Sequence, residues 1–155
     1  MKKKIILLVE DNPNDELLTR RAFEKNGIAD ALCVARDGVE ALDFLGGTGS
    51  HAGRDARLLP ALILLDLKLP KLSGLEVLKK LRANPLTHAI PVIILSSSDE
   101  YDDIFHSHRL GANSYLRKPV HFKEFMEIVA QVNLYWLQLN VSVNELEDNP
   151  GDKII

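Results

Sequence analysis

Three acidic side chains stand directly after two apolar runs of the sequence. Glu10 and Asp11 follow the run at 5–9, and Asp66 follows the run at 61–65. If these runs are parallel strands of one sheet, their carboxyl ends meet at one edge, and the three carboxylates share a small crevice. Carboxylates so close together raise each other's pKa unless a cation lies between them. The pattern therefore predicts a divalent cation, and Mg2+ fits because it binds one or two carboxylates together with waters and a phosphate.

Asp66 is the best candidate among the three for a nucleophile. It ends the most apolar run of the chain, and the loop after it, 67–70, leaves space above its carboxylate. A carboxylate can attack phosphorus and become an acyl phosphate. Lys118 and Ser96 end two other runs at the same edge, where the ammonium would balance the acids and both groups would bond a phosphoryl oxygen. The alternative is that the acids are separate helix caps and loop charges, that Lys118 is a solvated charge and that Ser96 is only a helix cap.

Five apolar segments predict the strands that position these residues. They lack alternation, which is typical of strands covered by helices on both faces. The segments are 5–9, 32–35, 61–65, 92–95 and the weaker 114–116.

Segments with helical spacing of apolar residues lie between and after these strands. Three helices are predicted by Leu17, Leu18, Ala22 and Phe23, by Val39, Leu42, Phe44 and Leu45, and by Leu75, Val77, Leu78 and Leu81. A fourth is expected to begin after the capping cluster at 96–99 and to stop at Gly111. The fifth presents one apolar face over about five turns, formed by Phe122, Phe125, Met126, Val129, Val132, Trp136 and Leu137.

This alternation of strands and helices predicts a doubly wound α/β fold. Short connections require right-handed crossovers, which build a five-stranded parallel sheet with five helices in three layers. The flavodoxin-like strand order 2-1-3-4-5 is one of the two common solutions.

Two segments fall outside this plan. The connection at 46–60 is long, which is typical of a functional or mobile loop, although a tolerated surface insertion is the alternative. Residues 140–155 are polar and include Pro150 and Gly151. We therefore expect a single domain at 1–139, followed by a tail that is partly disordered or forms an interface.

Composition excludes several classes of protein. The 155 residues, 46% of them hydrophobic, suffice for one domain with a sizeable core. A formal net charge of −3 leaves no basic excess for binding nucleic acid. Cys33 is the single cysteine, so we expect no disulfide framework and a reducing compartment. The apolar run near Met1 is too short for a signal peptide or a membrane span, which predicts a cytoplasmic protein without membrane contact.

Taken together, the motifs resemble the response-regulator receiver domains of two-component signalling, of the single-domain, CheY-like kind. They cover nearly the whole predicted fold, and jointly they are specific although each alone is weak. The matching segments are Leu8-Val9-Glu10-Asp11-Asn12, Leu64 to Pro70 with Gly74, Pro91 to Ser96, and Gly111 to Pro119.

The resemblance implies a phosphoacceptor that catalyses its own phosphorylation and dephosphorylation, rather than an enzyme with turnover. Asp66 would accept a phosphoryl group from a histidine kinase or a phosphotransfer protein. Mg2+ would be held by Glu10, Asp11 and Asp66 with the backbone carbonyl of Lys68. The output would be a changed contact with a downstream protein.

The resemblance also assigns a switch to the fourth and fifth strands. Ser96 and Tyr115 would be the switch pair, whose movement alters the surface of the last helices, although Tyr115 could also be only a core aromatic. The peptide bond between Lys118 and Pro119 would be cis, an isomer that proline makes accessible.

The connection at 46–60 and the sequence Tyr135-Trp136-Leu137 look like the small receivers that are paired with bacterial phytochromes. This likeness implies a phytochrome-like histidine kinase as the partner and a homodimer formed through the fifth helix and the tail. The fifth helix also carries more apolar residues than one core-facing side needs, and exposed apolar stripes often mark interfaces.

Two alternatives use the same fold. A phosphatase or hydrolase could use the aspartyl chemistry with turnover, and a binding scaffold could keep the fold without being phosphorylated. The sequence names neither the kinase nor the downstream partner.

Overall fold

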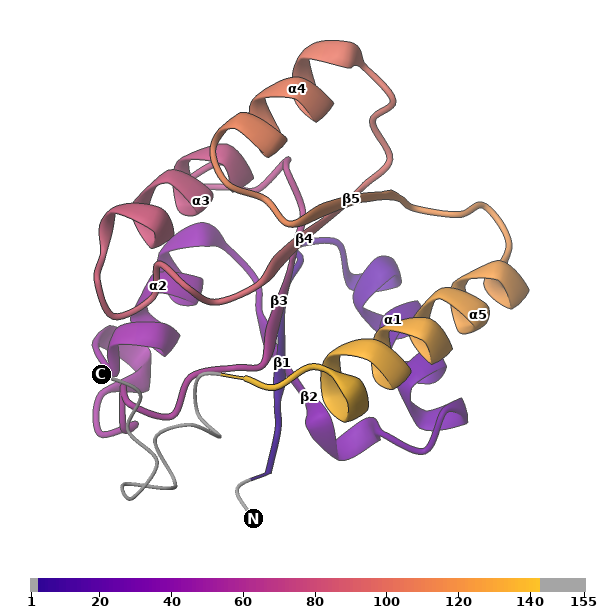
Figure 1. Cartoon of the computed structure of the whole chain (residues 1–155), viewed down its shortest axis with the longest axis horizontal. Coiled ribbons are helices and arrows are strands. Elements are labelled where there is room, and N and C mark those ends of the chain that lie inside the picture. Colours follow the sequence, from indigo (N-terminus) through magenta and orange to yellow (C-terminus); the bar gives the residue numbers. More distant parts are fainter. Residues whose placement is uncertain (1–2, 143–155) are drawn as a thin grey trace.

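Five parallel strands form the centre of the structure, in the order β2-β1-β3-β4-β5 (Figure 1). The computed structural model describes residues 3–142 of the 155-residue chain. The strands are β1 (Ile6–Val9), β2 (Leu32–Ala35), β3 (Leu62–Leu65), β4 (Val92–Ser96) and β5 (Ser114–Arg117). The predicted doubly wound α/β fold and its strand order are confirmed.

Helices cover both faces of this sheet, which gives the three predicted layers (Figure 1). The α1 helix packs against α5 on one face, and α3 contacts α2 and α4 on the other. The α-helices are α1 (Pro13–Lys25), α2 (Gly38–Gly46), α3 (Gly74–Ala83), α4 (Tyr101–Arg109) and α5 (Phe122–Val132). Short 3-10 helices lie at Ala29–Ala31 and Gly49–His51, and a π-helix lies at Asn133–Leu139.

The central strands are buried on both sides. Along β1, Leu7 and Val9 belong to the core beneath α2 and α3, whereas Ile6 and Leu8 belong to the core beneath α1 and α5. Successive residues of a strand face opposite sides of the sheet, so a sheet covered twice requires an unbroken apolar run. This explains why the strand segments of the sequence lack alternation.

Side-chain caps fix the starts of two helices that begin near the carboxyl ends of the strands. At α1 the side chain of Asn12 accepts the backbone N–H groups of Asn14 and Asp15. At α3 the side chains of Ser73 and Glu76 form a reciprocal capping box. Such caps satisfy N–H groups that a helix start leaves without partners, and they set where each helix leaves this edge of the sheet.

The α4 helix begins at Tyr101, after the cluster at 96–99 as predicted, but its cap residue is Glu100, which makes no side-chain hydrogen bond. The hydroxyl of Ser98 accepts the N–H of Glu100 at 3.2 Å and donates to Asp103 at 2.6 Å, so the serine cluster forms a turn ahead of the helix. The predicted end is confirmed, because Gly111 follows the last turn with a φ of 102° that favours glycine.

The predicted apolar stripe of α1 is only partly buried. Leu17 and Leu18 are 47% and 40% exposed, because Thr19, Ala22 and Phe23 form the buried side of this helix. A stripe read from spacing alone does not fix which of two adjacent residues faces the sheet.

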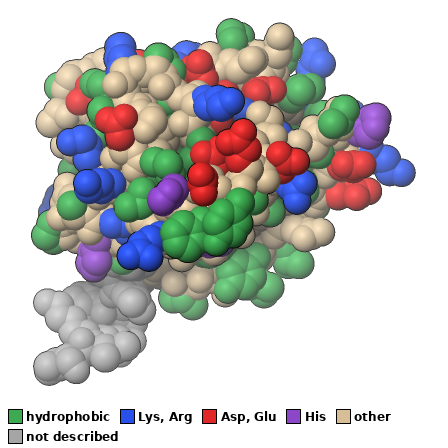
Figure 2. Space-filling view, turned by 90° about the horizontal axis from the view of Figure 1, so that it is seen from above, with side chains coloured by type: hydrophobic (Ala, Val, Ile, Leu, Met, Phe, Trp, Pro, Cys, Tyr) green, Lys and Arg blue, Asp and Glu red, His purple; other side chains and the backbone are tan. Residues whose placement is uncertain are grey.

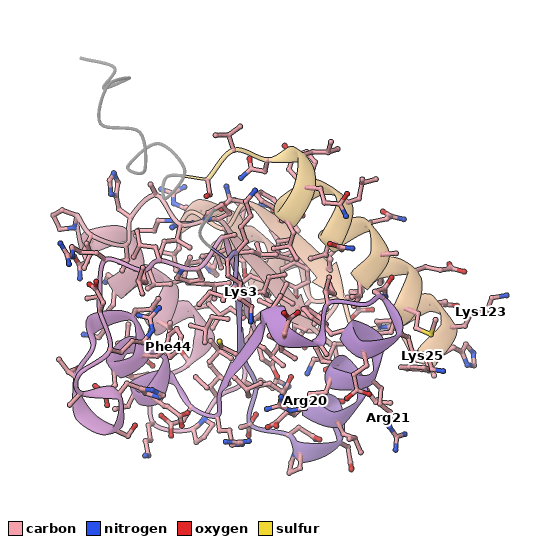
Figure 3. All side chains as sticks on the ribbon, turned by 90° about the horizontal axis from the view of Figure 1, so that it is seen from below. Lys3, Arg20, Arg21, Lys25, Phe44 and Lys123 are labelled. Atoms are coloured by element: carbon pink, nitrogen blue, oxygen red, sulfur yellow. The ribbon has the colours of Figure 1, made fainter. Side chains whose placement is uncertain are left out.

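Charged side chains occupy the outer side of the layer that α1 and α5 form. Arg20, Arg21 and Lys25 lie along α1, and Lys123 lies on the neighbouring α5 (Figure 3). Arg20 forms an ion pair with Glu16 at 3.0 Å, one turn earlier. The two helices are therefore amphipathic, with a solvated charged face opposite the core.

The fifth helical segment changes its geometry towards its end. The α5 helix is followed directly by the π-helix Asn133–Leu139, whose turns are wider. Trp136 and Leu137 still pack partly against the core beneath α1. Tyr135 and Leu139, in contrast, are 52% and 63% exposed. All seven residues of the predicted apolar face thus belong to this core or pack against it, which confirms that face, and the exposed residues lie outside it.

The long connection at 46–60 is held against α2 by Arg54. The guanidinium lies 3.9 Å from the centre of the Phe44 ring, an arrangement that attracts a cation. It also donates to the carbonyl oxygens of Phe44, at 2.9 Å, and of Leu58. The segment is therefore packed, and a function for it stays a prediction.

Most of the predicted tail lies outside the described residues, which end at 142. The division between a domain at 1–139 and a tail at 140–155 therefore stays a prediction. Within residues 3–142, no helix has both the length and the apolar character needed to cross a bilayer.

Near the end of α3, Arg82 connects this helix to the segments that precede β4 and β5. Its guanidinium donates to the carbonyl oxygens of His88, Ile90 and Gly111 and to the side chain of Asn113, at 2.8 to 3.1 Å. One planar cation thus satisfies three carbonyl groups from two segments, which lysine cannot reproduce.

We predict that Arg82→Ala lowers the free energy of unfolding by about 2 to 3 kcal/mol, because charge-assisted hydrogen bonds to backbone oxygens are lost. Urea unfolding measures the change. Lys79→Ala, at an exposed position of the same helix, is the control and should change stability by less than about 0.5 kcal/mol. Equal effects of the two substitutions would contradict this role of Arg82.

Candidate functional site

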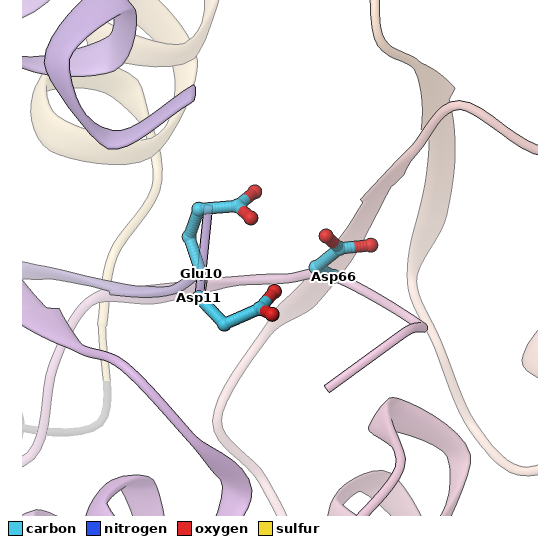
Figure 4. Close-up of side chains that lie close together, drawn as sticks. All are labelled: Glu10, Asp11 and Asp66. Atoms are coloured by element: carbon cyan, nitrogen blue, oxygen red, sulfur yellow. The ribbon is translucent and has the colours of Figure 1, made fainter. Parts of the chain in front are cut away.

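The three predicted acids converge at the carboxyl ends of the strands. Glu10 and Asp11 follow β1, Asp66 follows β3, and the two strands are neighbours that pair Val9 with Leu65. Carboxylate oxygens of the three acids lie within 4.8 Å of one another (Figure 4). Acidic side chains also gather on this face when the molecule is seen from above (Figure 2). The expectation of one shared crevice is confirmed.

The acids differ in exposure and in hydrogen bonding. Glu10 is buried, with 2% of its surface exposed, and its Oε1 accepts the N–H of Asn12 at 3.0 Å. Asp66 is 8% exposed, whereas Asp11 is exposed. Three carboxylates that converge with one open side suit a divalent cation, which can enter from solvent and keep some of its water.

Lys118 places its ammonium opposite these acids, as predicted. Its Nζ donates to Glu10 Oε2 at 2.7 Å and to Asp66 Oδ2 at 3.0 Å. A third bond, at 2.8 Å, goes to Asp15 Oδ2. The backbone N–H of Lys118 donates to the carbonyl oxygen of Ser96 at 2.8 Å, which fixes the lysine beside the end of β4.

Asp15 is the site residue that the sequence analysis missed. The Asn12-Pro13 pair is a helix-start signal, with Asn as the cap and Pro in the first turn, and it places Asp15 in the first turn of α1. First-turn side chains lie near the strand end that precedes the helix. This signal could have drawn attention to Asp15, but its contact with a lysine 103 residues further along the chain needed the structure.

The pKa values of two groups reflect this crowding. Burial, together with the charge of Asp66, raises the pKa of Glu10 from 4.5 to about 7, although hydrogen bonds from Lys118 and Asn12 oppose the shift. Burial alone would lower the pKa of Lys118, but the hydrogen bonds to Asp15 and Glu10 and the charge of Asp66 outweigh burial and raise it. The lysine therefore stays an ammonium.

The loop after Asp66 and the start of α3 both lie in close contact with Asp66. The backbone N–H of Lys68 lies 3.4 Å from Asp66 Oδ1, and the Lys68 side chain is exposed. Gly74 packs so tightly at the start of α3 that a Cβ there would lie 2.2 Å from the carbonyl oxygen of Asp66. Glycine is therefore required at this approach. The Lys68 carbonyl as a metal ligand stays a prediction.

Ser96 and Tyr115 both contact the residue Ser98. Ser96 is buried at the end of β4, and its Oγ accepts the N–H of Ser98 at 3.2 Å. The Tyr115 hydroxyl donates to the carbonyl oxygen of Ser98 at 2.8 Å, while its ring packs partly against the core. Tyr115 therefore contributes both a core aromatic and a hydroxyl contact.

The predicted cis peptide bond before Pro119 is wrong. Every peptide bond within residues 3–142 is trans. The trans isomer before proline is favoured by about 0.5 to 1 kcal/mol. In this structure Lys118 reaches its three carboxylates from the trans form, so nothing at the site requires the rarer isomer.

With this geometry established, the family can be stated. The model of the response regulator receiver domain matches residues 6–130. The chain belongs to this family. It is a receiver domain, phosphorylated on an aspartate by a kinase, and therefore a phosphoacceptor rather than a classical enzyme. Membership also implies a histidine kinase as partner.

Relatives of similar length support the assignment. The probable methanogenesis regulatory protein FilR2 of Methanothrix harundinacea is 42% identical over 138 residues, 89% of this chain and 86% of that protein. The response regulator Rcp1 of Synechocystis sp. is 38% identical over 135 residues, 87% of this chain and 90% of that protein.

Solved receiver structures are similar to this one. The phosphorylated cyanobacterial phytochrome response regulator RcpA has a TM-score of 0.83 at 37% identity, covering 92% of this receiver and 99% of that chain. The Mn2+-bound form of the response regulator Rcp1 has a TM-score of 0.79 at 37% identity, covering 90% and 98%. This receiver is thus similar to phytochrome-associated response regulators, and its acidic cluster is suited to a divalent metal.

The raised pKa of Glu10 predicts that Mg2+ binding depends on pH. Because this carboxyl is largely protonated below about pH 7, the metal must displace a proton there, and affinity should rise between about pH 6 and about pH 8. Isothermal titration calorimetry measures both the affinity and the released proton.

Glu10→Gln is the control for this prediction, because it removes the titrating group and should bind Mg2+ weakly with little pH dependence over the same range. A wild-type affinity as flat as that of the variant would show that Glu10 does not compete with the metal for a proton.

Proposed function

We propose that this receiver is a phosphorylation-dependent signalling switch that accepts its phosphoryl group on Asp66. The observation that carries the proposal is the placement of Asp66, whose carboxylate shares the ammonium of Lys118 with Glu10 and lies beside Asp11. A histidine kinase or a phosphotransfer protein supplies the phosphoryl group.

The chemistry is an in-line displacement at phosphorus. A carboxylate oxygen of Asp66 attacks, the bond between phosphorus and the donor imidazole nitrogen breaks, and the products are an acyl phosphate and a free imidazole. Lys118 bonds a phosphoryl oxygen and offsets the charge that collects there. Glu10, Asp11, Asp66 and the Lys68 carbonyl would hold Mg2+, which would neutralise phosphoryl charge.

Ser96 and Tyr115 pass the change on to the surface. In this structure both side chains bond to Ser98, one through its N–H and one through its carbonyl oxygen. When the Ser96 hydroxyl turns to donate to a phosphoryl oxygen, it leaves Ser98, and the segment on which Tyr115 rests is freed to move. The two hydrogen bonds to Ser98 thus couple the phosphoryl group to the fifth strand.

The output is a protein contact near α4. Tyr101 and Phe105 of this helix are 74% and 41% exposed, and their rings stack with centres 5.7 Å apart. His108 and Arg109 line the same shallow hollow as these two rings. Exposed aromatic side chains with a charged rim suit a protein interface.

We infer that the kinase partner is of the phytochrome type. The proposal is supported by the similarity of this chain to the phytochrome response regulator RcpA over nearly the full length of both. It does not name the kinase or its stimulus.

A homodimer through the π-helix and the residues after it belongs to the same proposal. Four apolar side chains in this region are 52% to 65% exposed, which leaves an apolar surface that a second copy could cover. They are Leu134, Tyr135, Leu139 and Val141.

Asp66→Asn should abolish phosphorylation by acetyl phosphate in the presence of Mg2+, because an amide cannot form the acyl phosphate. Intact-mass spectrometry of the wild type should show one added phosphoryl group that hydroxylamine removes. Asp102→Asn, an exposed acid on α4 that is not part of the carboxylate cluster, is the control and should be modified like the wild type.

Two outcomes would instead favour the alternatives for the function. Steady release of phosphate from small phosphoesters would indicate a hydrolase. Equal affinity of a partner for the wild type and for Asp66→Asn would indicate a scaffold that works without phosphorylation.

The combined substitution Tyr135→Lys and Leu139→Lys should convert a dimer into a monomer, because two charges would be buried without partners at the interface. Sedimentation velocity measures the state. Tyr101→Lys, which changes an even more exposed aromatic on α4, should leave the dimer intact. A wild type that is monomeric at high concentration, with and without phosphorylation, contradicts the dimer.

A further inference from the structure

The ammonium of Lys118 has three N–H groups and uses all of them on carboxylates from three different elements. Glu10 follows β1, Asp66 follows β3, and Asp15 lies in the first turn of α1. The Lys118 side chain is 16% exposed and that of Asp15 is 36% exposed, so this ion pair is partly shielded from water. An ammonium has three donors and no more, so each acceptor helps to fix its direction.

Two of these three acceptors also belong to the metal cluster. Glu10 and Asp66, together with Asp11, bring their oxygens within 4.8 Å of one another, and Asp15 is not part of this group. A divalent cation in the cluster attracts the oxygens of Glu10 and Asp66 and repels the ammonium. The bond to Asp15 is then the one that the cation does not compete for.

Asp15 is itself held firmly. Its backbone N–H donates to the side chain of Asn12 at 3.1 Å, and its carbonyl oxygen accepts the hydroxyl of Thr19 at 2.8 Å. The pair of Asp15 and Lys118 lines a mainly apolar pocket whose other walls include Leu18, Leu95, Phe122 and Phe125. Apolar surroundings lower the local dielectric constant and strengthen the attraction between the two charges.

We propose that Asp15 is a positioning residue for phosphoryl acceptance, which would keep the Lys118 ammonium directed at the phosphoryl group when Glu10 and Asp66 hold a divalent cation. The proposal rests on the function proposed above for Asp66 and Lys118. Asp15 touches neither the phosphoryl group nor the metal, and it acts only through the lysine. An acyl phosphate has lost the charge of the Asp66 carboxylate. A phosphoryl oxygen therefore replaces Asp66 as the third acceptor of Lys118, and the hydrogen bond from Lys118 to Asp15 is kept.

A plainer role for Asp15 would be that of an ordinary acid in the first turn of a helix, where it interacts with the helix dipole. That role would affect the stability of α1 but would not depend on Lys118. The two roles therefore separate in a double-mutant cycle with the lysine.

The test measures the affinity for beryllofluoride, an analogue of the phosphoryl group, by calorimetry at saturating Mg2+. Asp15→Ala should weaken binding by about 5- to 10-fold, less than the direct loss of a charge-assisted hydrogen bond to the ligand, because Asp15 acts only through the lysine. Asp15→Asn keeps an acceptor oxygen at the same place and should recover most of this loss. Asp102→Ala removes an acid from the first turn of α4 and should bind like the wild type.

In a Lys118→Ala background, Asp15→Ala should cause no further loss, because the group it positions is gone. An unchanged affinity of Asp15→Ala, or an equal loss with and without Lys118, overturns the positioning role. Either result leaves the proposed function standing if Lys118→Ala alone still weakens binding. Failure of the wild type to bind beryllofluoride at all would overturn the proposed function itself.

Discussion

The structure depends on the balance between four carboxylates and one ammonium at the carboxyl ends of β1, β3 and β5. Glu10, Asp66 and Asp15 all accept hydrogen bonds from Lys118, and Asp11 lies beside them with its carboxylate exposed. A single positive charge cannot offset this much negative charge, and burial, with a smaller contribution from the charge of Asp66, raises the pKa of Glu10. The site is therefore suited to bind a divalent cation. Such a cation would also offset the negative charge of a phosphoryl group.

The fold serves to bring these groups together from distant parts of the chain. Covering the sheet on both faces buries β1 and β3 completely, so their ends are fixed within a rigid core. The Asn12 cap and the close approach at Gly74 then set how α1 and α3 leave the same edge. Connections at this edge carry all the residues of the site, which is where parallel α/β sheets generally bind their ligands.

The sequence predicts the parts of this arrangement that are local or that follow from strand order. Apolar runs ending at Glu10, Asp66 and Lys118 are sufficient to place these residues at one edge, because parallel strands align their ends. The contact of Asp15 with Lys118 was not foreseeable in this way, because it depends on the direction in which α1 leaves its cap.

Other differences have equally physical causes. Helical spacing did not reveal that Leu17 is exposed, since a shift of one residue rotates a helix by about 100°. The change from α- to π-geometry at Asn133 has no strong sequence signal. The bond before Pro119 is trans, the isomer that X–Pro bonds favour in general.

The most direct measurement is a crystal structure of the protein with Mg2+ and beryllofluoride. The account predicts beryllium bonded to the Asp66 carboxylate, the metal among Glu10, Asp11 and Asp66, and the Lys118 ammonium within hydrogen-bond distance of a fluoride. Beryllofluoride on another carboxylate, or Lys118 turned away from it, would contradict the account.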